Sequence, residues 1–403
     1  MIKFLFFLLL LPAMSFGLFD GIASFPWAIV IFPFLVKKSD LGRYVFLLSF
    51  LLLFSVGQLM FSEINLLYYS KSCIAFINAT ILLPVFLSYD RRIILKVIDV
   101  FEVYLVLSIL IGFLQLTVPS VREATSFLFG HASGFGAKGP PGLSYEPSRS
   151  ALDMIYIFVT CIFVHKYMGK RMSGWLFYLV LIYLLIINRS ISAYLFLSVY
   201  LLLWLTFIPS LKYKVFALFL TPCICILLYC NAEFIDSHAL NSIQKLMHST
   251  NKKELIFSLA GHRLTGLLGS YESISFLGEG LGNWTIVMED FVSKNINLIK
   301  NISHYRTVGN KVYAPMTFMG RFTLEMGILG MLIYFSLLLK KIPLSRAFRE
   351  IRYSAEFLTI ISSLVFLSYG SNPLPFICLA VLVNISRTSK FDRNSELSNK
   401  MTD

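Results

Sequence analysis

Long apolar runs alternate with short polar connections along most of this chain. A helix needs about 20 predominantly apolar residues to cross the hydrocarbon core of a bilayer. Counted in this way, the pattern predicts about twelve membrane-spanning helices, at residues 2–18, 22–36, 44–61, 67–88, 93–118, 150–168, 173–188, 190–208, 215–231, 316–339, 355–369 and 374–386. The predicted fold is therefore all-α, that of a polytopic integral membrane protein.

The first two apolar runs lie close together. MIKFLFFLLLLPAMSFG, residues 1–17, has the basic residue, the apolar run and the small residues of a secretory signal peptide. A second run, IASFPWAIVIFPFLV, follows almost at once and ends in Lys37 and Lys38. A helical hairpin explains both runs better than a cleaved signal does, so we expect the first run to be retained.

Basic residues mark alternate connections between the predicted spans. Each even-numbered span is followed by lysines and arginines, at positions 37, 38 and 43; 91, 92 and 96; 166, 170 and 171; 212 and 214; 340, 341, 346, 349 and 352; and 387, 390, 393 and 400. The short connections on the other side hold only Arg189. Because cytoplasmic connections carry an excess of lysine and arginine, the pattern predicts that both termini are cytoplasmic.

This orientation divides the chain into three regions. Residues 1–231 hold predicted helices 1–9 and a first outer loop, 119–149. Residues 232–315 form one large outer loop between helices 9 and 10, with short helical pieces of its own. Residues 316–403 hold helices 10–12 and a cytoplasmic tail, and no internal repeat is visible in the sequence.

The composition agrees with a membrane protein. It indicates neither a nucleic-acid-binding protein nor a cysteine metal site. The chain is 57% hydrophobic and only 14% charged, which is more apolar surface than a soluble domain hides. The net charge of +13 does not predict a nucleic-acid partner, because the charges lie between apolar runs rather than in one basic domain. The six cysteines lie in or beside apolar segments without CxxC spacing, so we expect them to pack rather than to bind metal.

Several arginines are predicted to lie on the outer side of the membrane, although lysine and arginine are concentrated on the cytoplasmic side. They are Arg122, Arg149, Arg189, Arg263, Arg306 and Arg321. Arg149, Arg189 and Arg321 lie at span ends, at the depth of the lipid headgroups, where each taken singly is an ordinary anchor. Brought together from different spans, they would bind phosphate or pyrophosphate, because the guanidinium fork matches phosphate oxygens and stays charged.

The stretch GPPGLSYEPSRS, residues 139–150, is poor material for a membrane helix although it directly precedes one. Pro147 suits the first turn of a helix, where its missing N–H costs nothing. Glu146 would then lie at the positive end of that helix. On local chemistry it caps the helix and pairs with Arg149; the alternative is a carboxylate held beside a reacting hydroxyl.

Two further features do not indicate a nucleotide or metal site. FLGEGLGNW, residues 276–284, lacks the preceding strand and the Lys-Ser/Thr ending of a phosphate loop, so we expect a tight turn beside a helix end. The histidines show neither HxxxH nor HExxH spacing, and we predict no metal and no cofactor.

Four stretches, in this order, resemble the Wzy-type O-antigen polymerases, within the O-antigen ligase/polymerase superfamily. They are GLSYEPS (142–148), NRSISAYL (188–195), HRLTGLLGSYESISFLGEGLGNW (262–284) and MGRFTLEMGILGML (319–332). The resemblance covers most of the chain from about residue 100 to 340, and it extends to the predicted frame of about twelve spans.

The resemblance implies a metal-independent glycosyltransferase in the bacterial inner membrane, with the loop 232–315 in the periplasm. Its substrate would be undecaprenyl-pyrophosphate-linked oligosaccharide, polymerised at the periplasmic face, and a chain-length regulator in the membrane is a further candidate partner. Arginines would stabilise the leaving pyrophosphate. The implied catalytic residues are Arg189, Arg263 and Glu146, and the implied binding residues are Arg149, Arg321, Arg122 and His304.

One departure from the pattern bears on the reaction. Members of the ligase branch have a histidine near the start of the helix that follows the large loop, whereas this chain reads APMTFMGRF there. This favours polymerase over ligase and leaves the general base unassigned, with His304 as one candidate. A flippase or polysaccharide exporter is the rival class, although such transporters often show two related halves. A structural scaffold would leave the outward arginines unexplained.

Overall fold

The chain folds into a bundle of helices in the computed structural model. The structure describes residues 1–11, 26–37, 40–59, 66–129, 139–144, 146–168, 172–207, 265–296, 315, 317–340, 351–366 and 371–400. Within these ranges it contains helices, turns and no strand. The all-α prediction is confirmed for this part of the chain.

The helices follow the predicted apolar runs. Their bounds are α1 Ile2–Leu10, α2 Trp27–Leu35, α3 Leu41–Leu59, α4 Leu66–Thr80, α5 Leu83–Leu87, α6 Arg91–Thr117, α7 Pro119–Phe129, α8 Pro147–Tyr167, α9 Gly174–Ile182, the π-helix η3 Tyr183–Asn188, α10 Ile191–Phe207, α14 Trp284–Lys294, α17 Phe318–Leu338, α19 Ala355–Phe366 and α20 Leu374–Lys400. The predicted span 215–231 lies outside the described residues.

Four segments are long and apolar enough to cross a membrane: Leu66–Leu87, Arg91–Thr117, Pro147–Tyr167 and Phe318–Leu338. Shorter apolar helices accompany them at Leu41–Phe54, Gly174–Asn188, Ser192–Phe207, Ala355–Phe366 and Leu374–Arg387. A helix of 17 residues or fewer is short for the hydrocarbon core. The membrane character is thus supported, and the full number of spans stays a prediction.

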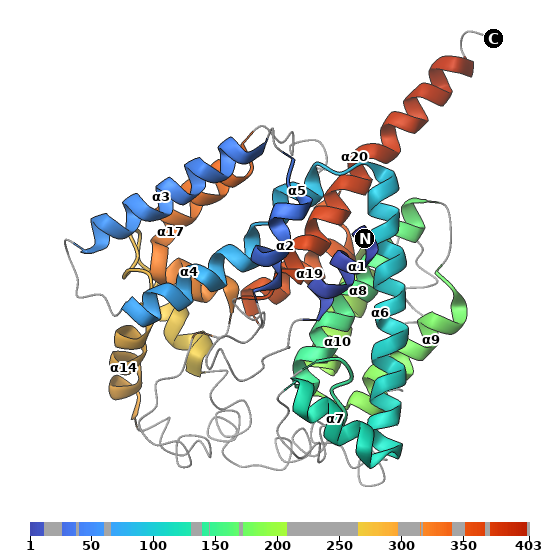
Figure 1. Ribbon diagram of the computed structural model, residues 1–403, viewed down its shortest axis with the longest axis horizontal. Helices are drawn as coiled ribbons and strands as arrows, with labels where there is room; N and C mark the ends of the chain where they lie inside the picture. The colour runs from blue at the N-terminus through green and yellow to red at the C-terminus, as the bar shows by residue number, and fades with distance from the viewer. Residues whose placement is uncertain are drawn as a thin grey trace.

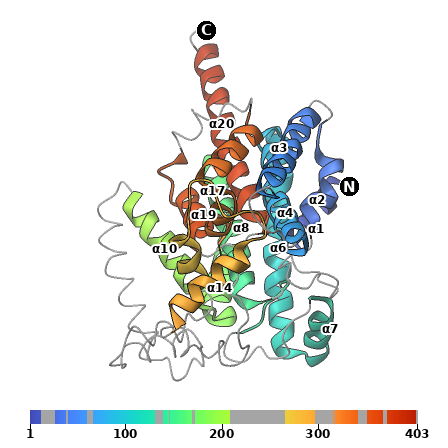
Figure 2. The ribbon, with the colours of Figure 1, turned by 90° about the vertical axis from the view of Figure 1, so that its left-hand side faces the viewer.

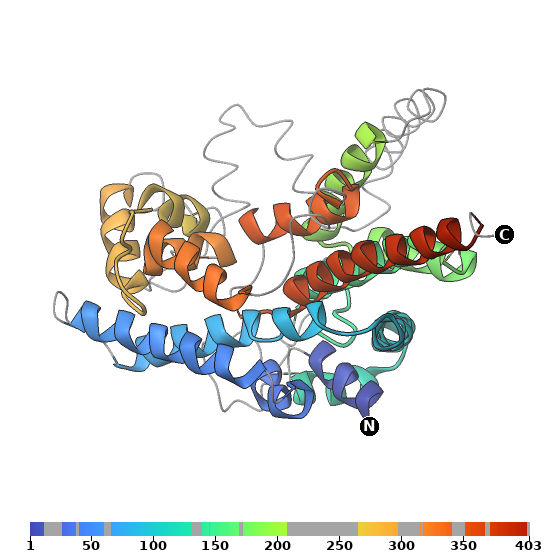
Figure 3. The ribbon, with the colours of Figure 1, turned by 90° about the horizontal axis from the view of Figure 1, so that it is seen from above.

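Two segments differ from the sequence-based assignment. Residues 119–129, predicted as part of an outer loop, form the helix α7, which begins at Pro119. Pro119 fits a first helical turn because that position needs no N–H donor. The last helix, predicted to end near residue 386, continues to Lys400, so that its C-terminal end extends beyond the bundle (Figure 2, Figure 3).

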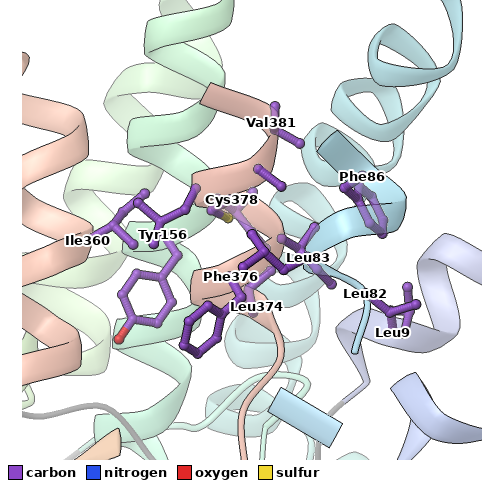
Figure 4. Packing of buried hydrophobic residues seen from close by; sticks show 14 of the residues in the cluster. Leu9, Leu82, Leu83, Phe86, Tyr156, Ile360, Leu374, Phe376, Cys378 and Val381 are labelled. Carbon is purple, nitrogen blue, oxygen red and sulfur yellow. The ribbon is translucent and has the colours of Figure 1, made fainter. Parts of the chain in front are cut away.

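The bundle has two sides joined by the C-terminal helix. Figure 1 shows α3, α4, α14 and α17 on the left and α6, α7, α8, α9 and α10 on the right. Between them, α20 packs against both α8 and α5. Figure 4 shows this junction, where Cys378 and Phe376 of α20 lie between Tyr156 of α8 and Leu83 of α5. All four side chains are almost fully buried.

The helix α8 lies at the centre of the bundle. In the most apolar 18-residue stretch of α8, 89% is buried inside the protein, compared with 50% for the corresponding stretch of α6. Lipid therefore contacts little of α8. The charged side chains in its buried part, Arg149 and Asp153, therefore face other protein groups, which is where charges within membrane-spanning segments are tolerated.

Candidate functional site

The start of α8 is built as the sequence predicts. Pro147 occupies the first turn, and Glu146 is the N-cap residue in an extended conformation. The Glu146 side chain makes no capping hydrogen bond to the helix backbone; its Oε1 accepts a hydrogen bond from Ser148 Oγ at 2.5 Å instead. The carboxylate is half-buried. The local prediction that the Glu146 side chain caps the helix is therefore wrong, and the N–H groups of Arg149 and Ser150 donate to the Glu146 carbonyl oxygen instead.

The turn before α8 is held against the π-helix η3. Asn188 Nδ2 donates to the carbonyl oxygens of Pro147, at 3.0 Å, and of Pro140, at 3.4 Å. Gly139 has φ +74°, and a Cβ on it would lie only 2.1 Å from the carbonyl oxygen of Ile187. Glycine is required there because the two backbones touch. Two of the four stretches that carry the family resemblance therefore pack together.

Arg189 follows η3 in an unusual conformation. Its φ is 53°, and it is the non-glycine residue with positive φ among the described parts of the chain. Its Nε donates to the carbonyl oxygen of Ile186 at 2.7 Å, which satisfies a carbonyl at the end of the helix. Non-glycine residues in this region carry a cost of about 1–3 kcal/mol and cluster at functional sites.

Arg149 lies one turn into α8 and is only 1% exposed. Its Nε lies 3.9 Å from Oδ2 of Asp153, one turn further along the helix and equally buried. Asn372 Nδ2 donates to the other carboxylate oxygen, Oδ1, at 2.7 Å. Arg149 was expected to be an anchor among the lipid headgroups, but it is enclosed in protein beside a buried acid.

The helix α17 is interrupted in the middle by an ordered loop. Gly327 has φ 70° and ψ 172°, far from helical values, and residues 275–280 lie alongside the break. Ile328 and Leu329 N–H groups donate to the carbonyls of Ser275 and Phe276, at 3.3 and 3.1 Å. The loop returns two bonds, from its own N–H groups to the carbonyls of residues 324 and 325. The loop thus supplies partners for four backbone groups around the break, and a membrane interior favours backbone groups that are paired in this way.

FLGEGLGNW, residues 276–284, overlaps this loop. Its three glycines, at positions 278, 280 and 282, all have positive φ, and α14 begins at its last residue, Trp284. The predicted tight turn beside a helix end is confirmed. Gly278 approaches Gly327 so closely that a Cβ would lie 2.3 Å from the Gly327 nitrogen. The third and fourth stretches of the resemblance thus also pack together.

Arg321, in the first turn of α17, is fixed by α4 and by its own helix. Its Nη2 donates to Ser72 Oγ at 2.8 Å, and Ser72 Oγ donates to Glu325 Oε1 at 2.7 Å. The same Oε1 lies 3.6 Å from Arg321 Nε and accepts from the Gly282 N–H at 3.4 Å. The guanidinium also lies over the ring of Trp284, 5.8 Å from its centre.

The two ion pairs, Arg149–Asp153 and Arg321–Glu325, differ in how far the arginine side chain is exposed. The Arg321 side chain is 15% exposed, whereas Glu325 is 0% exposed. Among the residues that the structure describes, Arg321 Nη1 has no hydrogen-bond partner. Arg321 can therefore offer a donor to an external anion while Glu325 balances its charge from the inside.

The stretch that precedes α20 connects these two neighbourhoods. Asn78 of α4 donates from Nδ2 to the carbonyl oxygen of Ser371 at 2.8 Å, and the next residue, Asn372, binds Asp153 of α8. A further tie joins the predicted outer loop to α19, because the hydroxyl of Tyr271 donates to the carbonyl of Val365 at 2.6 Å. Burial raises the pKa of Tyr271, which keeps this donor protonated.

The remaining predicted site residues have separate places. Arg122 lies on α7 and is half-buried. Arg263 and His304 lie outside the described residues. Within the described ranges, no group of three or more His, Cys, Asp or Glu side chains is arranged to hold a metal ion. Arg149 and Arg189 thus belong to the neighbourhood of α8, and Arg321 to that of α4 and α17.

Sequence reasoning missed the acids and the amides. Asp153 and Glu325 each follow an arginine by four residues, which places them on the same helix face, and this spacing was visible in the sequence. Ser72 and Asn372 come from distant segments, and no local pattern indicates that they meet Glu325 and Asp153. Only the tertiary structure brings them together.

No protein-family model matches the chain. No curated protein matches it either. A search of solved structures also finds no match.

Proposed function

We propose that this chain is a Wzy-type oligosaccharide repeat-unit polymerase of the bacterial inner membrane. In this proposal it polymerises undecaprenyl-pyrophosphate-linked oligosaccharide at the periplasmic face, to make O-antigen or capsule-type polysaccharide. The chain crosses the membrane with both termini in the cytoplasm, and residues 232–315 form the large periplasmic loop.

The proposal rests mainly on the exposure and the hydrogen bonds of Arg321. A partly exposed guanidinium is oriented by Ser72, balanced by the buried Glu325 and left with Nη1 available among the described residues. Guanidinium groups suit phosphate oxygens because the fork is planar and remains charged. The pairwise packing of the four stretches that resemble the family supports the same proposal.

The proposed reaction needs no metal and no nucleotide. A hydroxyl of the acceptor sugar attacks the anomeric carbon of the donor glycan, and the bond from that carbon to the pyrophosphate oxygen breaks. The pyrophosphate leaves on its lipid with the bonding electrons, and Arg321 stabilises the charge that develops there. Glu146 is the proposed carboxylate that receives the hydroxyl proton; its half-buried position at the mouth of α8 is compatible with that role.

Deletion of the gene tests this function. We expect surface glycan with one repeat on each lipid anchor, and restoration of a full ladder by the wild-type chain. Arg321→Lys is expected to fail nearly as badly as Arg321→Ala, because a point charge does not replace the planar fork. Membrane blots must show equal amounts of each variant. An anchor with no repeat at all would favour a ligase or a flippase, and an unchanged ladder would remove the proposal.

A further inference from the structure

Arg321 has several partners at the start of α17. Three groups converge on one atom, Oε1 of Glu325: the Ser72 hydroxyl at 2.7 Å, the Gly282 N–H at 3.4 Å and Arg321 Nε at 3.6 Å. They come from α4, from the loop before α14 and from α17. Ser72 also accepts a hydrogen bond from Arg321 Nη2, so it lies between the guanidinium and the carboxylate.

We propose that Ser72 and Glu325 are positioning residues of a pyrophosphate subsite, which hold the Arg321 guanidinium in its binding orientation before the ligand arrives. This inference rests on the proposed function, whose leaving group is a pyrophosphate. Neither residue needs to touch the substrate. Their effect on binding passes through the orientation of Arg321.

Orientation in advance has a clear physical benefit at this place. A free arginine side chain loses about 2 kcal/mol of rotamer entropy when it is immobilised. Here the Ser72 bond and the Trp284 ring restrict the guanidinium in the absence of ligand. A ligand then binds a group that is already ordered, so it does not have to supply that cost.

Charge balance explains why Glu325 is buried inside the protein next to Arg321. Glu325 follows Arg321 by one helical turn and is fully buried, whereas the Arg321 side chain is partly exposed. An uncompensated charge at this depth would be costly. The ion pair removes that cost while the outer edge of the fork stays available to an anion.

A structural role for Ser72 is the competing explanation, since its bonds also tie α4 to α17. The chain offers a matched control for this. Thr80 Oγ1 and the Tyr334 hydroxyl, 2.6 Å apart, form a second buried bond between the same two helices. Tyr334 is in the second half of α17, away from Arg321, so Tyr334→Phe removes a comparable tie between the helices without touching the guanidinium.

The test is the affinity of the purified, detergent-solubilised full chain for inorganic pyrophosphate. We compare the wild type with Ser72→Val, Ser72→Thr, Ser72→Ala and Tyr334→Phe. Val and Thr have nearly the same shape and differ in the hydroxyl, and Ala removes the hydroxyl without adding volume. The ligand-free melting temperature of each variant is measured alongside, because it reports the structural tie between the helices.

Loss of a hydrogen bond to a charged group predicts weaker binding by about tenfold or more for Ser72→Val and Ser72→Ala. Ser72→Thr is expected to stay within about threefold of the wild type, since its hydroxyl remains. Tyr334→Phe is expected to bind as the wild type does, even if its melting temperature falls as far as that of Ser72→Ala.

Three results would overturn the inference. They are no binding of pyrophosphate by the wild type, equal binding by Ser72→Ala and the wild type, and a loss of affinity in Tyr334→Phe as large as in Ser72→Ala. The gene deletion separates this outcome from the proposed function. If gene deletion removes the ladder but all variants bind pyrophosphate equally, only the positioning role is rejected. If the affinities are as expected but gene deletion leaves the ladder unchanged, the polymerase is rejected and the pyrophosphate subsite is retained.

Discussion

Arg149 and Arg321 occupy equivalent places in their helices but differ in surroundings. Each lies in the first turns of a long helix, and each has an acid four residues further on. Arg149 is almost fully enclosed, whereas Arg321 retains an exposed edge. At the scale of single residues, we therefore expect an internal role for the Arg149 pair and propose the ligand-facing role for Arg321.

Arg149→Met leaves Asp153 buried without its ion-pair partner. Breaking such a pair costs about 3–5 kcal/mol, whereas replacing both partners with apolar residues is often neutral. We expect Arg149→Met to lower the amount of protein in the membrane, and Arg149→Met with Asp153→Leu to restore it. Blots and melting temperatures measure both effects. An abundant Arg149→Met variant would show that the pair contributes little to folding.

Glu146→Gln tests the other carboxylate at the mouth of α8. Because the side chain makes no capping bond to the helix, we expect no loss of protein. We expect loss of polymer, since removal of a positioned base costs roughly 100- to 10,000-fold in rate. Glycan banding is read beside a membrane blot. A normal ladder would exclude Glu146 from the reaction.

At the scale of elements, the sequence predicted most of the helices, but it predicted neither α7 nor the break in α17. Each predicted span that lies in the described residues is helical, because the apolar runs are long and bounded by polar residues. The interruption of α17 was not predictable: EMGILG is apolar enough to continue a helix, and the hydrogen bonds that accompany the break come from the distant residues 275–280. The partners of Asp153 and Glu325 were not predictable for the same reason, because Asn372 and Ser72 also come from distant segments.

Gly327→Ala tests the break directly. The φ of 70° and ψ of 172° are reached almost only by glycine, and a Cβ would lie 2.3 Å from the backbone carbon of Leu277. Strain and displacement together are expected to cost at least about 3 kcal/mol. Gly330→Ala is the control, since its nearest neighbours are side chains, at 3.1 Å or more. Equal melting temperatures for the two variants would contradict a required break.

At the scale of the whole molecule, the charge pattern predicts an orientation that the helices alone do not give. The start of α8 lies beside the turn 139–144, and its last turn carries His165 and Lys166. Under the positive-inside rule the end of α8 is cytoplasmic and the loop that contains α14 is external. Both halves of the candidate site, at the starts of α8 and α17, then face the same side of the membrane.

Reporter fusions decide this orientation. We expect a fusion after Met168 to show cytoplasmic reporter activity and a fusion after Lys294 to show periplasmic activity, because basic connections are retained inside. A fusion after Thr117 serves as a second external control. Cytoplasmic activity after Lys294 would invert the predicted topology and place Arg321 on the wrong side for a lipid-linked donor.

Polymerisation by the purified chain is the most direct measurement. The protein is reconstituted in liposomes with one synthetic polyprenyl-pyrophosphate-linked repeat, with a metal chelator present and no nucleotide sugar. We predict a ladder of glycans with release of polyprenyl pyrophosphate, and no ladder from Arg321→Ala at equal protein. Substrate that stays as single repeats, or a ladder that needs an added nucleotide sugar, would contradict a polymerase that uses the pyrophosphate-linked glycan as donor.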